Sequence, residues 1–134
     1  LFRMPITDMV YQKSDRDLFF IATGTGLVPF LHILDELRKS SIRKKVTVLF
    51  GCMNESDDIT EQYLGEYMEY FDIKLYVCVE NAISKKYYKG RVTDLLNDLD
   101  INFNKFDFYI CGHPHMTDAV LKQIRSKGAD RIFY

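Results

Sequence analysis

The chain has 134 residues, of which 47% are hydrophobic and 28% charged, the proportions of an ordinary globular domain. Its formal net charge of −1 gives no argument for binding nucleic acid or a membrane surface. It contains no apolar run long enough for a membrane span and no signal-peptide core at its start, so we expect a cytoplasmic protein. The three cysteines are odd in number and lack Cys-x-x-Cys spacing, which predicts reduced thiols.

Hydrophobic periodicity predicts strands that alternate with helices along the whole chain. Residues 1–17 are expected to form an extended entry segment with a short helix near Asp8 to Gln12. The predicted strands are 18–22, 46–50, 73–79, 106–110 and 131–134. The predicted helices are 27–39, a second that Thr60 caps and that carries apolar residues as far as Phe71, a short third opening at Thr93, and 115–127, closed by Gly128.

This alternation requires parallel strands and right-handed crossovers. We therefore predict one α/β domain, residues 1–134, with a doubly wound five-stranded parallel sheet in the order 3-2-1-4-5 and helices on both faces. The carboxyl ends of all strands then share one edge of the sheet, which is where ligands bind in such folds.

A glycine-rich turn joins the first strand to the first helix in the segment Thr23-Gly-Thr-Gly-Leu-Val-Pro29. Gly24 and Gly26 allow a ligand to approach the backbone, and the first N–H groups of the helix have no partner within it. Such a turn suits a phosphate group. It lacks the third glycine of the dinucleotide fingerprint and the Gly-Lys-Ser/Thr of a nucleotide-triphosphate loop, so a plain tight turn stays open as the alternative.

A second turn of the same design, Cys111-Gly-His-Pro-His-Met116, follows the fourth strand. Together, Ala22–Pro29 and Tyr109–Met116 closely resemble the paired signatures of the ferredoxin–NADP reductase superfamily, in its pyridine-nucleotide-binding domain. Gly90-Arg-Val-Thr-Asp94 and the terminal Arg131-Ile-Phe-Tyr134 also resemble segments of that family, so the resemblance covers nearly the whole chain.

The resemblance implies an NAD(P)H site that lies across both turns. The implied neighbours of the pyrophosphate and nicotinamide are Thr23, Gly24, Thr25, Gly26 and Pro29. Those of the nicotinamide and its ribose are Cys111, Gly112, Pro114 and Met116, and Tyr134 falls where the family has aromatic residues near the flavin. Cys111 is the implied residue at the reacting ring, as a packing and polarity element, with a plain buried thiol as the alternative.

The resemblance also implies that hydride passes from the nicotinamide to FAD, which a β-barrel domain upstream in the same or a partner chain would hold. We expect the chain to be part of a longer protein or assembly, because it starts at Leu1 and has no run of short alternating strands before Leu18. The chain alone is therefore not expected to be a competent flavin oxidoreductase. Electrons would pass on to a downstream acceptor such as an iron–sulfur protein or domain.

The choice between NADH and NADPH depends on the groups that meet the adenosine ribose after the second and third strands. Asn54, Glu55 and Glu80 lie there, and carboxylates accept hydrogen bonds from a free 2′-hydroxyl and repel a 2′-phosphate. NADH is therefore favoured. Lys85, Lys86 and Arg91 in the following loop argue for a phosphate, unless they are merely solvated.

The same residues raise three other possible functions. A metal site at His113, His115 and Cys111 is disfavoured, because neighbouring residues of one turn point in different directions and no fourth ligand has matching spacing. A flavodoxin-like receiver is disfavoured because the required acidic cluster and lysine do not follow the strands. A non-catalytic nucleotide-binding or electron-transfer adaptor subunit remains the alternative.

Overall fold

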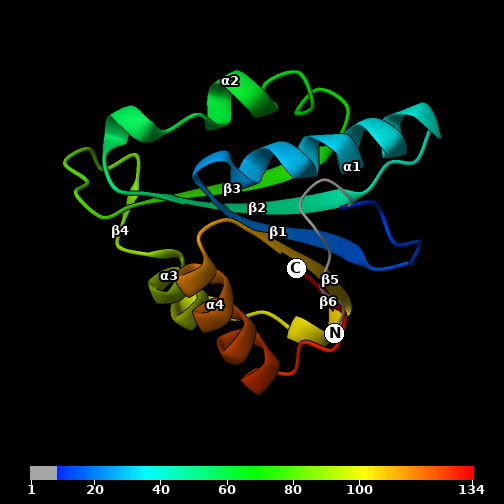
Figure 1. Ribbon diagram of the computed structural model, residues 1–134. Coiled ribbons are helices and arrows are strands. Elements are labelled where there is room, and N and C mark those ends of the chain that lie inside the picture. Colours follow the sequence, from blue (N-terminus) through cyan, green and yellow to red (C-terminus); the bar gives the residue numbers. More distant parts are fainter. Residues whose placement is uncertain (1–8) are drawn as a thin grey trace.

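The computed structural model describes residues 9–134, in which a parallel sheet lies between two layers of helices (Figure 1). The strands are β1 (Asp17–Thr23), β2 (Lys45–Cys52), β3 (Asp72–Val79), β4 (Tyr88–Lys89), β5 (Phe106–Cys111) and β6 (Ile132–Phe133). The helices are α1 (Val28–Lys39), α2 (Thr60–Leu64), α3 (Val92–Asp98) and α4 (Pro114–Ser126). Short 3₁₀ turns occupy Gly24–Leu27, Glu55–Asp57 and Phe103–Lys105.

The strand order is β4-β3-β2-β1-β5-β6, and all neighbouring strands are parallel. The five predicted strands are present in the predicted order, so the fold class is confirmed. The number of strands was wrong, because β4 adds a sixth strand at the edge beside β3. β4 consists of two residues, which pair as Tyr88 with Cys78 and Lys89 with Val79. A segment this short shows no alternating pattern in the sequence.

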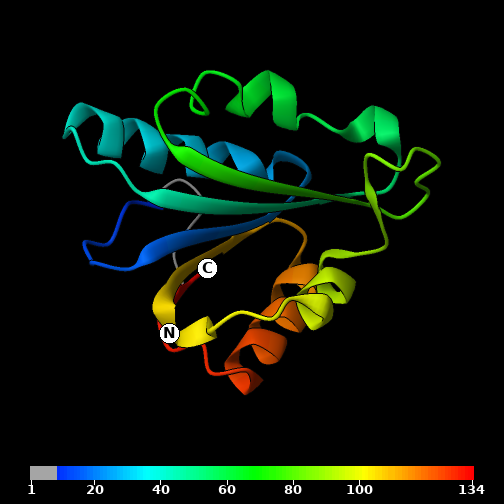
Figure 2. The same cartoon turned by 180° about the vertical axis from the view of Figure 1, so that it is seen from behind.

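The sheet separates two hydrophobic clusters because successive side chains of a strand point to opposite faces. Phe20 of β1 points toward α1 and stacks on Phe30, with ring centroids 4.5 Å apart. Phe19 points to the other face, where its ring lies 4.9 Å from Phe108. Figures 1 and 2 show α1 and α2 on the first face and α3 and α4 on the second. Each fully buried phenylalanine contributes roughly 1.5–3 kcal/mol to folding.

The second helix differs from its prediction in length and in its cap. It ends at Leu64, and the following residues up to Phe71 form separate hydrogen-bonded turns that keep Tyr67 and Phe71 on the buried face. Thr60 is the first residue of the helix and not its cap. Its N–H and hydroxyl donate to the carboxylate of Asp58, at 2.9 and 2.6 Å.

The prediction for the start of the chain was wrong where it can be compared, whereas the prediction for the end of α4 was confirmed. The predicted helix near residue 8 is wrong for residues 9–12, which have no regular structure, and the remainder of the entry segment, residues 1–8, lies outside the described residues. At the other end, Gly128 follows α4 with a φ of +102°, as expected for a glycine that ends a helix. No helix within residues 9–134 combines the length and apolar character that crossing a bilayer requires.

Candidate functional site

The turn after β1 places backbone N–H groups at the carboxyl edge of the sheet. Gly24 has a φ of +53°, and the 3₁₀ turn that it opens leads directly into α1. Pro29 lies in the first turn of α1, where the missing N–H costs no hydrogen bond. The exposed residues Gly24 and Thr25 therefore present the start of the helix to solvent.

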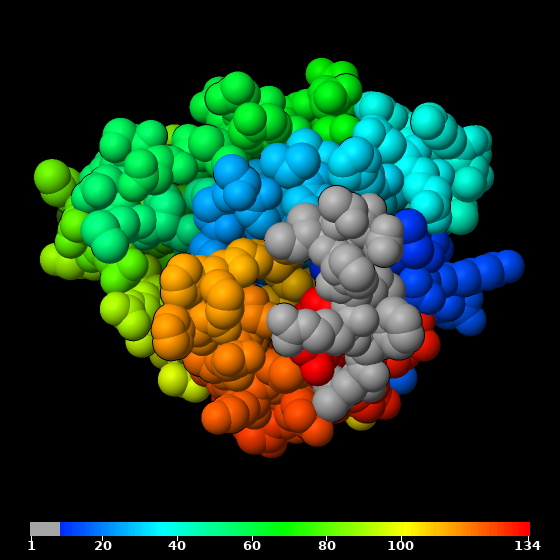
Figure 3. Space-filling model, in the orientation of Figure 1, coloured from blue at the N-terminus to red at the C-terminus, as the bar shows by residue number. Residues whose placement is uncertain are grey.

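The turn after β5 packs directly on the turn after β1. A Cβ at Gly26 would lie 2.2 Å from the carbonyl oxygen of Cys111, and one at Gly112 would lie 2.3 Å from the Thr23 hydroxyl. Gly112 also has a φ of +149°, which favours glycine. The N–H of His113 donates to the Thr23 hydroxyl across 3.1 Å. Both glycines are thus required by the close approach of the two turns, which also lie against each other in Figure 3 (blue and orange).

These turns form one wall of a cleft of about 950 Å³ at the carboxyl edge of the sheet. Such a volume falls within the range of small-molecule and cofactor sites. Its lining residues come from the ends of β1 and β2, from the segments that follow β1 to β5, and from the N-terminal parts of α3 and α4: Thr23, Gly24, Thr25, Gly51, Cys52, Met53, Ser56, Asp57, Ile59, Glu80, Gly90, Arg91, Val92, Thr93, His113, His115, Met116 and Ala119. A smaller hollow of about 270 Å³ lies at the opposite edge, away from both glycine-rich turns.

Among residues 9–134, three side chains of ordinarily fixed charge line the cleft. Arg91 binds Glu80 through its Nε, 3.0 Å from the carboxylate, and Asp57 lies on the opposite segment after β2. Arg91 is the more exposed partner, with 73% of its side chain exposed against 35% for Glu80. The pKa of the Cys52 thiol on the cleft wall is raised to about 11 by burial and by Asp58, Asp57 and Glu80.

Comparison with known proteins identifies what kind of domain this cleft belongs to. Residues 20–122 match the family of oxidoreductase NAD-binding domains, over a stretch that runs from β1 into α4. The chain belongs to the oxidoreductase NAD-binding domain family. This confirms the family resemblance that the two glycine-bearing turns indicate.

Two curated relatives are electron transfer components. The chain is 27% identical over 125 residues to that of toluate 1,2-dioxygenase from Pseudomonas putida, covering 92% of the chain and 37% of the relative. It is 29% identical over 118 residues to that of anthranilate 1,2-dioxygenase from Acinetobacter baylyi, covering 87% and 34%. The NAD-binding domain thus spans about a third of the length of these relatives.

A solved structure has the same fold. It is the flavohem-like FAD/NAD binding domain of nitric oxide dioxygenase from Vibrio cholerae O1 biovar El Tor, with a TM-score of 0.74 at 24% identity. The match covers 92% of this NAD-binding domain and 52% of that chain.

Not all residues that the sequence singles out line the cleft of the NAD-binding domain. Thr23, Gly24, Thr25, Glu80 and Met116 do. Gly26, Cys111 and Gly112 form the contact between the two turns, and Pro29 and Pro114 lie in the first turns of α1 and α4. Tyr134 packs against the hydrophobic cluster under α3 and α4, outside the cleft.

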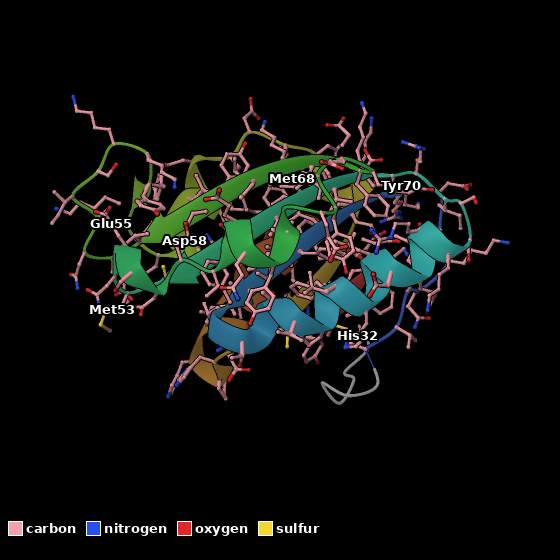
Figure 4. The ribbon with its side chains drawn as sticks, turned by 90° about the horizontal axis from the view of Figure 1, so that it is seen from above. His32, Met53, Glu55, Asp58, Met68 and Tyr70 are labelled. Carbon is pink, nitrogen blue, oxygen red and sulfur yellow. The ribbon has the colours of Figure 1, made fainter. Side chains whose placement is uncertain are left out.

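Asn54 and Glu55 hold a neighbouring loop and do not line the cleft. The Glu55 carboxylate accepts hydrogen bonds from the N–H groups of Ile83 and Ser84, at 2.6 and 3.0 Å. The bonds from Ser84 and Ile83 lower the pKa of Glu55. Asn54 accepts a hydrogen bond from the Asn81 side chain at 3.0 Å. Figure 4 shows Glu55 together with Met53 and Asp58 at one end of the α2 layer.

The basic residues of the loop after β3 are also divided. Arg91 lines the cleft, whereas Lys85 and Lys86 are exposed and do not line it. Lys86 lies over the ring of Tyr87, with its Nζ 5.2 Å from the ring centroid. Within this loop, Arg91 is therefore the cation placed to meet a ligand.

Sequence reasoning considered His113 and His115 as metal ligands, disfavoured that role, and missed their interaction with each other. The Nδ1 of His113 caps α4 by accepting the N–H of His115 at 3.2 Å. Their rings stack with centroids 5.2 Å apart and planes inclined by 20°. Within residues 9–134, no group of three His, Cys, Asp or Glu residues is arranged to hold a metal ion. The signal for the cap was present, since Pro114 directly follows His113 as the first residue of the helix.

Proposed function

We propose that this domain binds NAD(P)H, with NADH favoured, and positions it for hydride transfer to FAD held by a flavin-binding domain. The observation that carries the proposal is the contact of the two glycine-bearing turns at one wall of a large cleft. A dinucleotide is long enough to need two such supports, and the family is one of NAD-binding domains of oxidoreductases.

The residues present fit the phosphate groups of such a ligand. A side chain at Gly26 or Gly112 would collide with the facing turn. The two glycines therefore let the two turns pack against each other beside the cleft. The start of α1 offers N–H groups without partners inside the helix, which bind anions well. We assign Thr23 to Gly26 and Pro29 to the pyrophosphate on this basis, with Gly112, Pro114 and Met116 toward the nicotinamide.

Cys111 is proposed as the packing residue at the reacting ring. It is 3% exposed, and burial raises the pKa of its thiol, so the neutral thiol is the expected form. A bound reduced nicotinamide supplies the hydride, and the cofactors carry that chemistry. The domain supplies binding, orientation and exclusion of water, and no proton transfer is assigned to a side chain.

Glu80 is the preferred ribose contact for NADH. It is the one of the three candidate polar residues that lines the cleft, and its carboxylate accepts hydrogen bonds from a free 2′-hydroxyl. Asn54 and Glu55 would then act indirectly, through the loop that they hold against the segment after β2. Tyr134 is proposed to lie near the flavin, at the nicotinamide end of the dinucleotide.

The flavin domain and the electron acceptor are part of the proposal. The chain spans about a third of relatives that are named electron transfer components, which supports further domains in the same or a partner chain. An iron–sulfur protein or domain is the proposed next acceptor. A non-catalytic nucleotide-binding subunit is the competing outcome.

The test combines calorimetry on this chain with spectroscopy on the complete protein. We expect weak binding of NADH, weaker binding of NADPH, and bleaching of a bound flavin by NADH under anaerobic conditions. Binding without any flavin in the complete protein would favour the non-catalytic subunit. Absence of binding of either dinucleotide by both forms would overturn the proposal.

A further inference from the structure

The cleft has few groups that can balance the negative charge of a dinucleotide. Within residues 9–134, its lining holds one arginine and no lysine. That arginine, Arg91, is already paired with Glu80 at 3.0 Å, and Asp57 adds a second carboxylate. A diphosphate that enters this cleft therefore meets backbone N–H groups but no unpaired fixed cation among the described residues.

Two histidines lie on the same cleft wall. His113 and His115 are both exposed and both line the cleft, and they lie at the start of the 13-residue helix α4. Histidine is the side chain that ordinarily changes charge between about pH 5 and pH 8. A protonated histidine here would therefore supply a positive charge that the fixed charges of the cleft do not.

The geometry gives the two rings different tasks. The Nδ1 of His113 accepts the N–H of His115, and an acceptor nitrogen carries no proton. A proton on Nδ1 of His113 would break this cap. Among residues 9–134 the ring of His115 does not cap a helix, and it stacks on the ring of His113 with centroids 5.2 Å apart.

We propose that His115 is a phosphate-binding residue of this cleft and makes dinucleotide affinity depend on pH. The inference rests on the proposed function, since it concerns the same ligand in the same cleft. A dianionic diphosphate binds the protonated form of His115 more tightly than the neutral form. Affinity is therefore highest at low pH and falls as the pH rises through the titration range of histidine.

Other charged groups around His115 modify this effect without supplying it. Asp57 and Glu80 face the cleft from the segments after β2 and β3, and Asp118 follows one turn later on α4, so all three favour a cation. Arg91 faces it from before α3 and opposes one, as does the start of the helix. Cys52, whose thiol pKa is about 11, stays neutral over the same range.

The experiment measures the affinity for ADP-ribose by calorimetry at about pH 6, 7 and 8, which spans the histidine range. ADP-ribose carries the diphosphate and adenosine of the dinucleotide, and its diphosphate keeps its charge over this range. Adenosine serves as the probe without phosphate. The variants are His115→Gln, which cannot be charged, and His113→Asn, whose side-chain oxygen keeps an acceptor for the cap.

The chain offers a matched control in its remaining histidine. His32 is exposed on α1 and does not line the cleft, and Figure 4 shows it away from the segment that carries Met53 and Glu55. His32→Gln removes one titrating imidazole and is expected to leave the pH dependence intact.

For the wild type we expect affinity for ADP-ribose to fall about threefold to fivefold from about pH 6 to about pH 8, as for one exposed ion pair. His115→Gln should lose this dependence, His113→Asn and His32→Gln should keep it, and adenosine should show none. An equal dependence in His115→Gln and the wild type, or its loss in His32→Gln, overturns the inference while the proposed function stands. Failure of ADP-ribose, NADH and NADPH to bind at any pH removes the proposed function itself.

Discussion

The N–H of His113 donates a hydrogen bond to the hydroxyl of Thr23 across 3.1 Å, although the two residues are 90 positions apart in the chain. This bond joins the turn after β1 to the turn after β5. It exists because β1 and β5 are adjacent in the sheet, with Ala22 opposite Cys111 as the last pair before the turns diverge. The sheet topology thus brings two sequence motifs to one wall of the cleft.

Replacing Thr23 by valine tests this link. Thr23→Val keeps the shape of the side chain but leaves the N–H of His113 without its acceptor. We expect a loss of stability of about 1 kcal/mol and weaker binding of NADH. Urea denaturation and calorimetry measure the two effects. Thr47→Val on β2 is the control, since Thr47 is half-buried but lies away from the cleft. Equal losses in both variants would contradict the role of the link.

The glycines of the two turns should differ in their tolerance of alanine. At Gly26 an added Cβ would lie 2.2 Å from a backbone oxygen, so Gly26→Ala should destabilise the domain by roughly 2–3 kcal/mol. A Cβ added at Gly24 would meet no neighbouring atom within 4 Å. Only the positive φ of +53° opposes alanine there, and we expect Gly24→Ala to cost about 1–2 kcal/mol of stability. Urea denaturation ranks the two variants, and the reverse order would argue against the close packing of the turns.

The regular part of the fold could be predicted because its signals are local. Leu18 to Ala22 is a continuous apolar run, and Leu34 and Leu37 recur at helical spacing, so β1 and α1 followed directly. The pattern around Tyr67 and Phe71 misled, because a chain of separate turns can bury the same face as a helix. β4 could not be found because its two residues owe their conformation to pairing with β3.

The sequence predicted that the two glycine-bearing turns lie side by side, but it did not predict where the side chains after β2 and β3 point. Glycine requirements can be inferred from sequence, since few other residues fit such turns. The direction of a carboxylate cannot be inferred in this way. Glu55 turns toward the N–H groups of Ile83 and Ser84, whereas Glu80 turns toward Arg91, and both contacts depend on how two loops meet.

Glutamine at position 80 tests the choice of dinucleotide. Glu80→Gln removes the charge that accepts from a ribose hydroxyl and frees Arg91 for a 2′-phosphate. We expect the affinity for NADPH relative to NADH to rise about fivefold to tenfold, measured by calorimetry. Glu55→Gln is the matched control and should leave this ratio unchanged, because its carboxylate binds loop N–H groups. A change in ratio only in the Glu55 variant would move the ribose contact to that residue.

Cys52 should be unreactive despite its place on the cleft wall. Burial and then Asp58, Asp57 and Glu80 raise its pKa to about 11, so at pH 8 only about one thiol in a thousand is ionised. Iodoacetamide labelling followed by mass spectrometry should be slow and should accelerate about tenfold for each pH unit. Asp58→Asn removes one charge and should speed labelling of Cys52, while Cys78, with a pKa of about 12, stays protected. Rapid labelling of Cys52 at pH 7 would contradict the effect of burial and of the neighbouring carboxylates on its thiol.

Stability should depend on an ion pair at the far edge of the sheet. The carboxylate of Asp107 is fully buried, and one of its oxygens accepts from Nε of Arg131 at 2.6 Å, while the other has no hydrogen-bond partner among residues 9–134. Arg131→Met removes the counter-charge that is hydrogen-bonded to Asp107, and because Arg131 is itself 35% exposed we expect a loss of about 2 kcal/mol rather than the larger cost of a fully buried pair. Adding Asp107→Leu to Arg131→Met should recover most of that loss, since no charge then stays buried. Urea denaturation of the single and double variants measures the difference, and Arg125→Met at an exposed position of α4 should have little effect. A double variant less stable than Arg131→Met would mean that packing around Asp107, and not its charge, determines the stability of this edge.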